Sequence, residues 1–183
     1  MKTLRTAVAL GLWTAGLVAA QAPKYGVGRA VSAAEIGNYG IMVGADGKGL
    51  PEGSGTAVEG KAVYAAKCGN CHGAKGEGGI GTALVGGKGT LATAKPLKTV
   101  GSYWPYATTV WDYVHRAMPF DRAGTLKYDE VYSVVAYVLF LNGIVEEKQV
   151  MNASTLPKVR MPNRDGFVPD PRPDVGRMGK ARE

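Results

Sequence analysis

Residues 68–72 read Cys-Gly-Asn-Cys-His, and this C-x-x-C-H pattern is the attachment signature of a c-type haem. Two thiols three positions apart can each form a thioether with one vinyl group of the same porphyrin. The imidazole of His72 follows at once and can coordinate the iron as the proximal ligand. The motif therefore predicts one covalently attached haem c bound by Cys68, Cys71 and His72, with His72 as an iron ligand. Iron held in this way carries electrons, so we expect an electron-transfer protein that is not an enzyme by itself.

Other uses of the two cysteines fit the sequence less well. A redox motif of the thioredoxin type would lie beside a βαβ pattern, which the sequence does not show. A zinc site would need a fourth ligand, and His115 is the only other histidine in a chain that has two cysteines. A disulfide between Cys68 and Cys71 would leave His72 unexplained. Haem attachment is the interpretation that uses all three side chains.

The N-terminus has the pattern of a secretory signal peptide. Lys2 and Arg5 precede an apolar run at 7–20, and residues 20–22 (Ala-Gln-Ala) form a small-x-small cleavage site. The run of about 14 residues is shorter than the ~20 that a spanning helix needs, which disfavours the alternative of an uncleaved membrane anchor. We therefore expect residues 1–22 to be removed and the mature chain to reach a bacterial periplasm, without a membrane span.

The charge of the chain is moderately positive. The formal net charge is +7 over 183 residues, and it falls to about +5 when Lys2 and Arg5 leave with the signal peptide. The sequence has no run of Lys and Arg of the kind that binds nucleic acid, so we expect no nucleic-acid partner. A charge of this size favours steering towards an acidic protein partner.

Three segments carry helix signals. Thr56 and Glu59 form a capping box for a helix expected over 57–67, which leads directly into the haem motif. Apolar residues at i, i+3, i+4 and i+7 predict a second helix over 106–117, with a proline on each side. A third helix is expected over 129–141, where the sequence is apolar almost all round, as in a buried helix. The pattern predicts an all-α protein.

The rest of the chain is predicted to be loop. Glycine is abundant, 27 of 183 residues, and clusters over 37–89, which argues for long loops and little sheet. Residues 23–55 are interpreted as an irregular leader, residues 56–143 as the haem domain, and residues 144–183 as an extended proline-rich tail. Such a tail either wraps the domain or reaches a partner, and we expect disorder after Asp174.

A six-coordinate haem needs a second axial ligand, and Met118 is the preferred candidate. It lies at the end of the second predicted helix, before a proline that fixes the backbone. Coordination by histidine and methionine raises the reduction potential, because the soft thioether favours ferrous iron. His115 is the competing ligand and would give a bis-histidine haem of lower potential, and an open sixth position is the third possibility. Met151 and Met161 in the tail are more remote candidates.

The order of these features resembles a class I cytochrome c. Gly60 and Tyr64 lie on the first helix, the haem motif and Met118 follow, and Tyr137 lies on the last helix. In that family the first and last helices cross, and a glycine and an aromatic residue of the first meet an aromatic residue of the last. The resemblance implies that Gly60 and Tyr64 meet Tyr137. It also implies a class I cytochrome c fold, with three or more helices around a covalently bound haem, long loops and an extended C-terminal tail.

One feature of that family differs here. A Gly-Pro after the haem motif usually offers the carbonyl that orients the proximal histidine, whereas residues 79–82 of this chain read Gly-Ile-Gly-Thr. The resemblance therefore leaves open which carbonyl serves His72.

A narrower resemblance covers most of the mature chain. Five segments are similar to the cytochrome subunits of sulfur-oxidising systems: 53–56 (Gly-Ser-Gly-Thr), 84–87 (Leu-Val-Gly-Gly), 99–105 (Thr-Val-Gly-Ser-Tyr-Trp-Pro), 116–120 (Arg-Ala-Met-Pro-Phe) and 161–167 (Met-Pro-Asn-Arg-Asp-Gly-Phe). Those subunits partner a molybdenum sulfite dehydrogenase or the related sulfane dehydrogenase. The resemblance implies that a molybdenum subunit oxidises the sulfur compound and passes single electrons to this haem. A downstream cytochrome or oxidase would then receive them.

Three aromatic residues are further candidates for the haem site. Tyr103 and Trp104 lie in the third of these segments, 99–105, and Tyr106 follows it. We expect them to line the haem edge, where phenol and indole donors could hydrogen-bond the propionates. The alternative is that they are ordinary core aromatics.

Two other functions stay open at the level of sequence. The first is a freely diffusing electron shuttle, against which the long tail argues because it resembles a binding appendage. The second is a haem enzyme that acts on a sulfur compound, which would need an open or exchangeable sixth position on the iron and not a firmly bound Met118.

Overall fold

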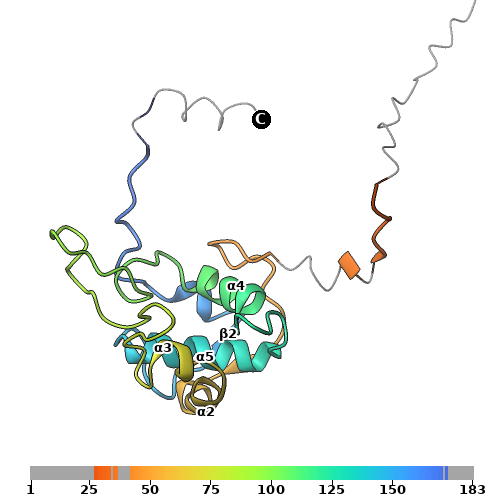
Figure 1. Ribbon diagram of the computed structural model, residues 1–183, viewed down its shortest axis with the longest axis horizontal. Coiled ribbons are helices and arrows are strands. Elements are labelled where there is room, and N and C mark those ends of the chain that lie inside the picture. The colour runs from red at the N-terminus through yellow and green to blue at the C-terminus, as the bar shows by residue number, and fades with distance from the viewer. Residues whose placement is uncertain (1–26, 34, 37–41, 171, 173–183) are drawn as a thin grey trace, which may run out of the picture.

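The computed structural model describes residues 27–33, 35–36, 42–170 and 172 (Figure 1). The predicted signal peptide and the segment after Asp174 lie outside the described residues. Within them the regular secondary structure is mostly helical, as predicted, and the loop over residues 73–106 extends to one side of the body. The elements in chain order are β1 (Ser54–Gly55), α2 (Ala57–Lys67), α3 (Gly69–His72), α4 (Ala107–Ala117), α5 (Tyr128–Leu141), β2 (Met151–Asn152) and the 3-10 helix η1 (Leu156–Lys158). None of the described helices is long and apolar enough to cross a lipid bilayer.

Helix α2 begins and ends where the sequence predicts. The hydroxyl of Thr56 accepts a hydrogen bond from the Glu59 amide at 3.4 Å, and the Glu59 carboxylate accepts one from the Thr56 amide at 2.8 Å. This capping box pairs backbone donors that a helix start otherwise leaves without partners. At the other end of α2, Lys67 forms an ion pair of 2.9 Å with Glu130 of α5. The helix is therefore fixed at its start locally and at its end by another helix.

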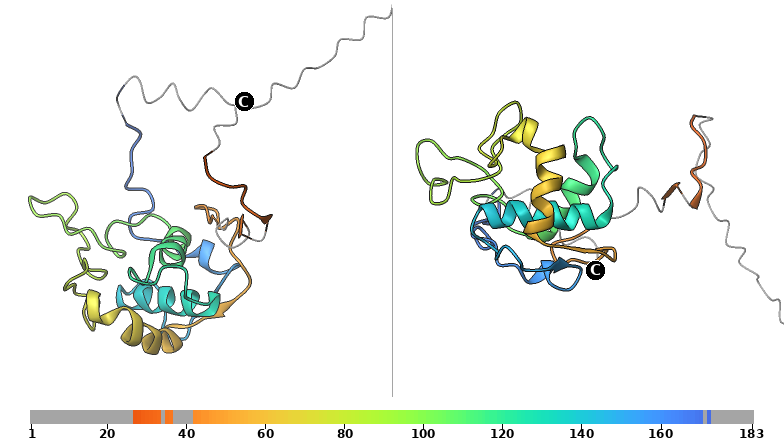
Figure 2. Two further views of the ribbon diagram at one scale, coloured as in Figure 1. Left: turned by 45° about the vertical axis from the view of Figure 1, so that its right-hand side comes forward. Right: turned by 90° about the horizontal axis from the view of Figure 1, so that it is seen from below.

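Helices α2 and α5 cross at Gly60, as the family resemblance implies (Figure 2, right). A methyl group at Gly60 would lie 2.9 Å from Cβ of Tyr137 and would collide with the Ser133 carbonyl oxygen. One turn later, the rings of Tyr64 and Tyr137 pack with their centroids 5.3 Å apart. The predicted meeting of Gly60 and Tyr64 with Tyr137 is confirmed. Because glycine has no side chain, the two backbones approach closely enough to bury this contact.

Helix α5 forms the centre of the core. It begins at Tyr128, one residue before the predicted start, because the Glu130 carboxylate accepts a hydrogen bond from the Lys127 amide at 2.9 Å and so caps the first turn. Nine consecutive residues of α5 are buried: Val131, Tyr132, Ser133, Val134, Val135, Ala136, Tyr137, Val138 and Leu139. Neighbours therefore cover the helix on all sides, as its continuous apolar sequence predicts.

Helix α4 packs against α5 through an aromatic cluster. The buried Trp111 ring stacks on His115 at 5.1 Å between centroids, with Tyr132 of α5 at 5.4 Å from the indole. The ring of Tyr128 meets His115 edge-on at 5.5 Å. Neither the indole nitrogen of Trp111 nor Nδ1 of His115 has a hydrogen-bond partner among the described residues. Burial is the main cause that lowers the pKa of His115, with Arg116 adding to it and Asp112 opposing it.

The leader and the tail meet, which the sequence does not predict. Strand β1 of the leader pairs antiparallel with β2 of the tail, with Gly55 opposite Met151. The side chains of Met151, Leu156 and Met161 are buried in the core. This short pair joins segments about a hundred positions apart, and no local pattern marks such a contact. The tail packs on the domain as far as Phe167, whereas Val168 directly after it is 84% exposed.

The end of the described tail packs on the loop before α4. The Asn163 side-chain amide donates a hydrogen bond to the Tyr103 carbonyl at 2.8 Å, and the Arg164 guanidinium lies 4.4 Å from the ring centroid of Tyr106. Phe167 packs edge-on against Tyr103 at 5.2 Å. Two of the sequence segments that carry the narrower resemblance, 99–105 and 161–167, are therefore in contact with each other.

We expect Gly60→Ala to lower the free energy of unfolding by about 2 kcal/mol, because the new methyl group must push α2 away from the Ser133 carbonyl. Urea unfolding of the haem-loaded protein measures this. The matched control is Lys61→Ala at the next, exposed position of α2, which should change the free energy by less than about 0.5 kcal/mol. Equal effects of the two substitutions would contradict the close crossing.

We expect His115 to make the protein less stable as the pH falls from about 6.5 towards 5. The folded state lowers the pKa of His115, so below the ordinary value the unfolded chain binds a proton that the folded chain resists. The contribution of His115 to the free energy of unfolding is therefore fully present above the ordinary pKa of histidine. It is lost as the pH falls from that value through the lower pKa of the folded state. Unfolding curves at several pH values measure the slope, and His115→Gln should flatten it. An unchanged slope in the variant would assign the pH dependence to other groups.

Candidate functional site

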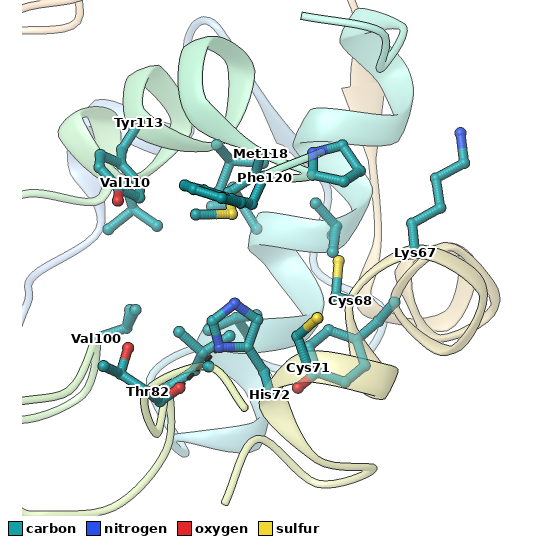
Figure 3. A pocket seen from close by; sticks show the side chains of 18 of the residues that line it. Lys67, Cys68, Cys71, His72, Thr82, Val100, Val110, Tyr113, Met118 and Phe120 are labelled. Carbon is teal, nitrogen blue, oxygen red and sulfur yellow. Dashed lines mark hydrogen bonds between the residues drawn. The ribbon is translucent and has the colours of Figure 1, made fainter. Parts of the chain in front are cut away.

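A cavity of about 690 Å³ opens between α4 on one side and α3 with the following loop on the other (Figure 3). It has the volume of a site for a large ligand. Helices α4 and α5 line its inner part with five valines: Val110, Val114, Val134, Val135 and Val138. Cys68, Cys71, His72 and Met118 all line this one cavity, although about fifty positions separate the first from the last. The structure therefore brings the predicted haem ligands together in an apolar setting.

The haem motif lies on the short helix α3, which the sequence analysis does not predict. The Cys68 amide donates to the Tyr64 carbonyl at 2.8 Å and so ends α2, while the Cys68 carbonyl accepts from the amides of Cys71 and His72 at 3.1 and 3.0 Å. The turn places both sulfur atoms on the same side of the cavity (Figure 3). The two thiols are free and not joined in a disulfide. Burial raises the pKa of the Cys68 thiol to about 11, so this group is protonated at neutral pH.

The ring of His72 is oriented by a backbone carbonyl. Its Nδ1 lies 2.7 Å from the carbonyl oxygen of Thr82, which can accept the Nδ1 proton (Figure 3). Nε2 is then the nitrogen with a free lone pair, which is the one that a metal would bind. The loop reaches the ring because the Gly81 amide donates to the Cys71 carbonyl at 2.8 Å. A methyl group at Gly81 would lie 2.9 Å from Nδ1, so the close approach requires glycine there.

Met118 lies across the cavity from His72 (Figure 3). Helix α4 ends at Ala117, and Met118 follows in an extended conformation while its amide still donates to the Val114 carbonyl at 3.1 Å. The side chain of Met118 thus leaves the helix at the wall of the cavity. A thioether sulfur and an imidazole nitrogen on opposite walls are a suitable pair of axial ligands for a haem iron.

His115, the competing ligand, is not among the residues that line the cavity. Val114 and His115 are consecutive on α4, so their side chains point about 100° apart around the helix. Val114 lines the cavity, whereas His115 belongs to the aromatic cluster with Trp111 and Tyr128. Met151 and Met161 are buried elsewhere in the core and do not line the cavity either.

The three predicted aromatic residues occupy different places, and Tyr106, the N-cap residue of α4, does not line the cavity. Trp104 lines the cavity and packs edge-on against Tyr113 of α4 at 5.7 Å between ring centroids. Tyr103 does not line the cavity, and its ring packs between Phe167 of the tail and the ammonium group of Lys98, which lies 5.0 Å from the ring centroid. Tyr113 also lines the cavity, and the sequence analysis does not single it out. Its place on the apolar stripe of α4, one turn before Ala117, is the signal that could have identified it as a cavity residue.

The residues present fit a haem. The cavity offers two free thiols side by side, an imidazole with its Nδ1 already engaged, a thioether on the opposite wall and apolar sides for a porphyrin. Within the part of the chain that the structure describes, no three His, Cys, Asp or Glu side chains are grouped so as to hold a metal ion, which leaves the zinc interpretation without a ligand set there. The donor set is the one that haem c requires.

Comparisons with known proteins agree with this geometry. Residues 55–138 match the family described as cytochrome c oxidase, cbb3-type, subunit III. A chain in the crystal structure of the sulfane dehydrogenase SoxCD from Paracoccus pantotrophus matches with a TM-score of 0.75 and 42% sequence identity, covering 87% of this chain and 79% of that chain. No curated protein gives a significant match. From the fold, the cavity and these matches, we conclude that this chain belongs to the cytochrome c family, whose members bind haem and transfer electrons.

Proposed function

We propose that this chain is a periplasmic cytochrome with one covalently attached haem c, and that it accepts single electrons from a molybdenum-containing sulfane or sulfite dehydrogenase subunit. It passes them to a downstream cytochrome or oxidase. The observation that carries the proposal is the placement of His72 and Met118 on opposite walls of one cavity, with both free thiols beside it. Export is supported by the signal-peptide pattern at 1–22.

Each residue of the cavity has a distinct part in this function. Cys68 and Cys71 would hold the porphyrin through thioethers, and His72 and Met118 would hold the iron. Bound haem supplies an iron that cycles between the ferric and ferrous states and so stores one electron. The valines of α4 and α5 keep water away from the cavity, and the Thr82 carbonyl fixes the tautomer and direction of the His72 ring.

The rim of the cavity supports docking of a partner. Ile80 and Phe120 both line the cavity, and each is 89% exposed. Large apolar side chains this exposed at the mouth of a site are typical of a surface that another protein covers. The 42% identity to a chain in a sulfane dehydrogenase structure supports a sulfur-oxidising enzyme as that protein.

We expect the oxidised holoprotein to show the weak sulfur-to-iron charge-transfer band at the red end of the visible spectrum. Met118→Ala should abolish the band, because it removes the thioether, and should lower the reduction potential. His115→Gln is the matched control three residues away and should keep the band. If instead Met118→Ala keeps the band, or if the wild-type spectrum is that of a bis-histidine haem, the assignment of Met118 is wrong. A high-spin wild-type spectrum would favour a haem enzyme.

We expect this chain to copurify with a molybdenum-containing subunit, and the sulfur substrate of that subunit to reduce the haem in the complex. Replacing both Ile80 and Phe120 with alanine should lower the rate of haem reduction roughly tenfold, because apolar contact at the rim is lost. Stopped-flow spectroscopy of the haem measures the rate. The control is Val58→Ala, since Val58 is half exposed on α2 and does not line the cavity. Isolation of the chain without any partner would favour the freely diffusing shuttle.

A further inference from the structure

The loop that carries Thr82 is braced by the end of α5. Asn142 is the residue that directly follows this helix, and its side-chain amide uses both of its ends. Nδ2 donates to the carbonyl oxygens of Leu84 at 3.1 Å and Val138 at 2.8 Å, and Oδ1 accepts from the Gly86 amide at 3.2 Å. Donors meet acceptors at each contact, so the orientation of the amide is fixed by its partners. One side chain thus connects the helix to two points of the loop.

Thr82 lies between this brace and the haem motif. On its N-terminal side, the Gly81 amide donates to the Cys71 carbonyl at 2.8 Å. On its C-terminal side, Leu84 is bound to Asn142 and its amide donates to the Gly76 carbonyl at 2.8 Å. The Thr82 carbonyl is therefore held from two sides, and the hydrogen bond of 2.7 Å to Nδ1 of His72 depends on both.

Space for the Asn142 amide is provided by Gly101. A methyl group at Gly101 would lie 2.9 Å from Cβ of Asn142 and would collide with its Oδ1. Gly101 is buried, and the neighbouring Val100 amide donates to the same Leu84 carbonyl at 3.2 Å. Three chain segments thus meet at the amide: the end of α5, the loop at 84–86 and the loop at 100–101. Asn142 itself does not line the cavity, although two of its partners, Leu84 and Val138, do.

We propose that Asn142 is a positioning residue for the proximal ligand, acting through Leu84 to hold the Thr82 carbonyl against Nδ1 of His72. A firm hydrogen bond at Nδ1 makes the imidazole a stronger donor, and a stronger donor favours ferric iron. Asn142 therefore keeps the reduction potential lower than it would be with a loose loop. The inference rests on the proposed function, because it takes His72 as an iron ligand.

The test compares Asn142→Leu with the wild-type holoprotein. Leucine has a similar size but makes none of the three hydrogen bonds. We expect the Nδ1 proton of His72, followed by NMR in the reduced, diamagnetic protein, to exchange with solvent roughly tenfold faster. We also expect the midpoint potential to rise. The matched control is Leu141→Ala, one position earlier, which removes partly buried apolar contact without any bond to the loop and should change neither quantity.

Gly101→Ala is a second, independent variant. Its methyl group displaces the Asn142 amide while Asn142 itself is kept, so it should give the same faster exchange and the same rise in potential. If Asn142→Leu does not fold, Gly101→Ala by itself tests whether Asn142 positions His72. Unchanged exchange and potential in a folded variant would show that Asn142 only caps α5, and the inference would be wrong.

Failure of the proposed function gives a different result. A wild-type spectrum with another sixth ligand would overturn Met118 and leave this test intact, because both readouts concern His72. A change in potential without faster exchange of the Nδ1 proton would point to altered haem exposure, and would also contradict the part assigned to Asn142.

Discussion

Helices α2 and α5 cross at Gly60 with their backbones in close contact, and this crossing determines where the haem motif lies. It sets the backbone of α2 directly against Ser133, and the paired rings of Tyr64 and Tyr137 then fix the direction in which α2 continues. The haem motif follows α2 at once, so its position relative to α5 is a consequence of this crossing. The Tyr64 hydroxyl extends the same link by donating to the Gly73 carbonyl at 2.9 Å, just past the motif. The packing of α2 on α5 thus determines where one wall of the cavity lies.

The opposite wall of the cavity depends on which face of α4 points into the cavity and which packs against α5. One stripe of α4 lines the cavity and leads to Met118, and the neighbouring stripe carries Trp111 and His115 into the aromatic cluster against α5. Rotation of α4 by one residue would exchange the two and present an imidazole to the cavity. The burial of Trp111 opposes this rotation, because an indole of this size has no other place in the core. Packing on the far side of α4 thereby places Met118, and not His115, at the cavity.

The leader and the tail contribute to the core without lining the cavity. Pairing of β1 with β2 and burial of Met151, Leu156 and Met161 complete the core there, so these segments have a structural part that does not require a partner. The mouth of the cavity keeps its exposed apolar rim. The added segments thus contribute to the stability of the fold without supplying a residue to the cavity.

The elements with local signals could be predicted from the amino-acid sequence. The capping box at Thr56, the stripe of α4 and the continuous apolar run of α5 predict helices within a residue of their observed ends, because capping and periodicity act over a few positions. The motif at 68–72 likewise predicts the chemistry of the site. Three other features could be seen only in the folded protein: His115 turns away from the cavity, the Thr82 carbonyl meets His72, and the leader and the tail form a strand pair. Each of these arrangements depends on packing between segments that are distant in the sequence. The contacts that stabilise it exist only after the helices have packed together, so no local pattern predicts it.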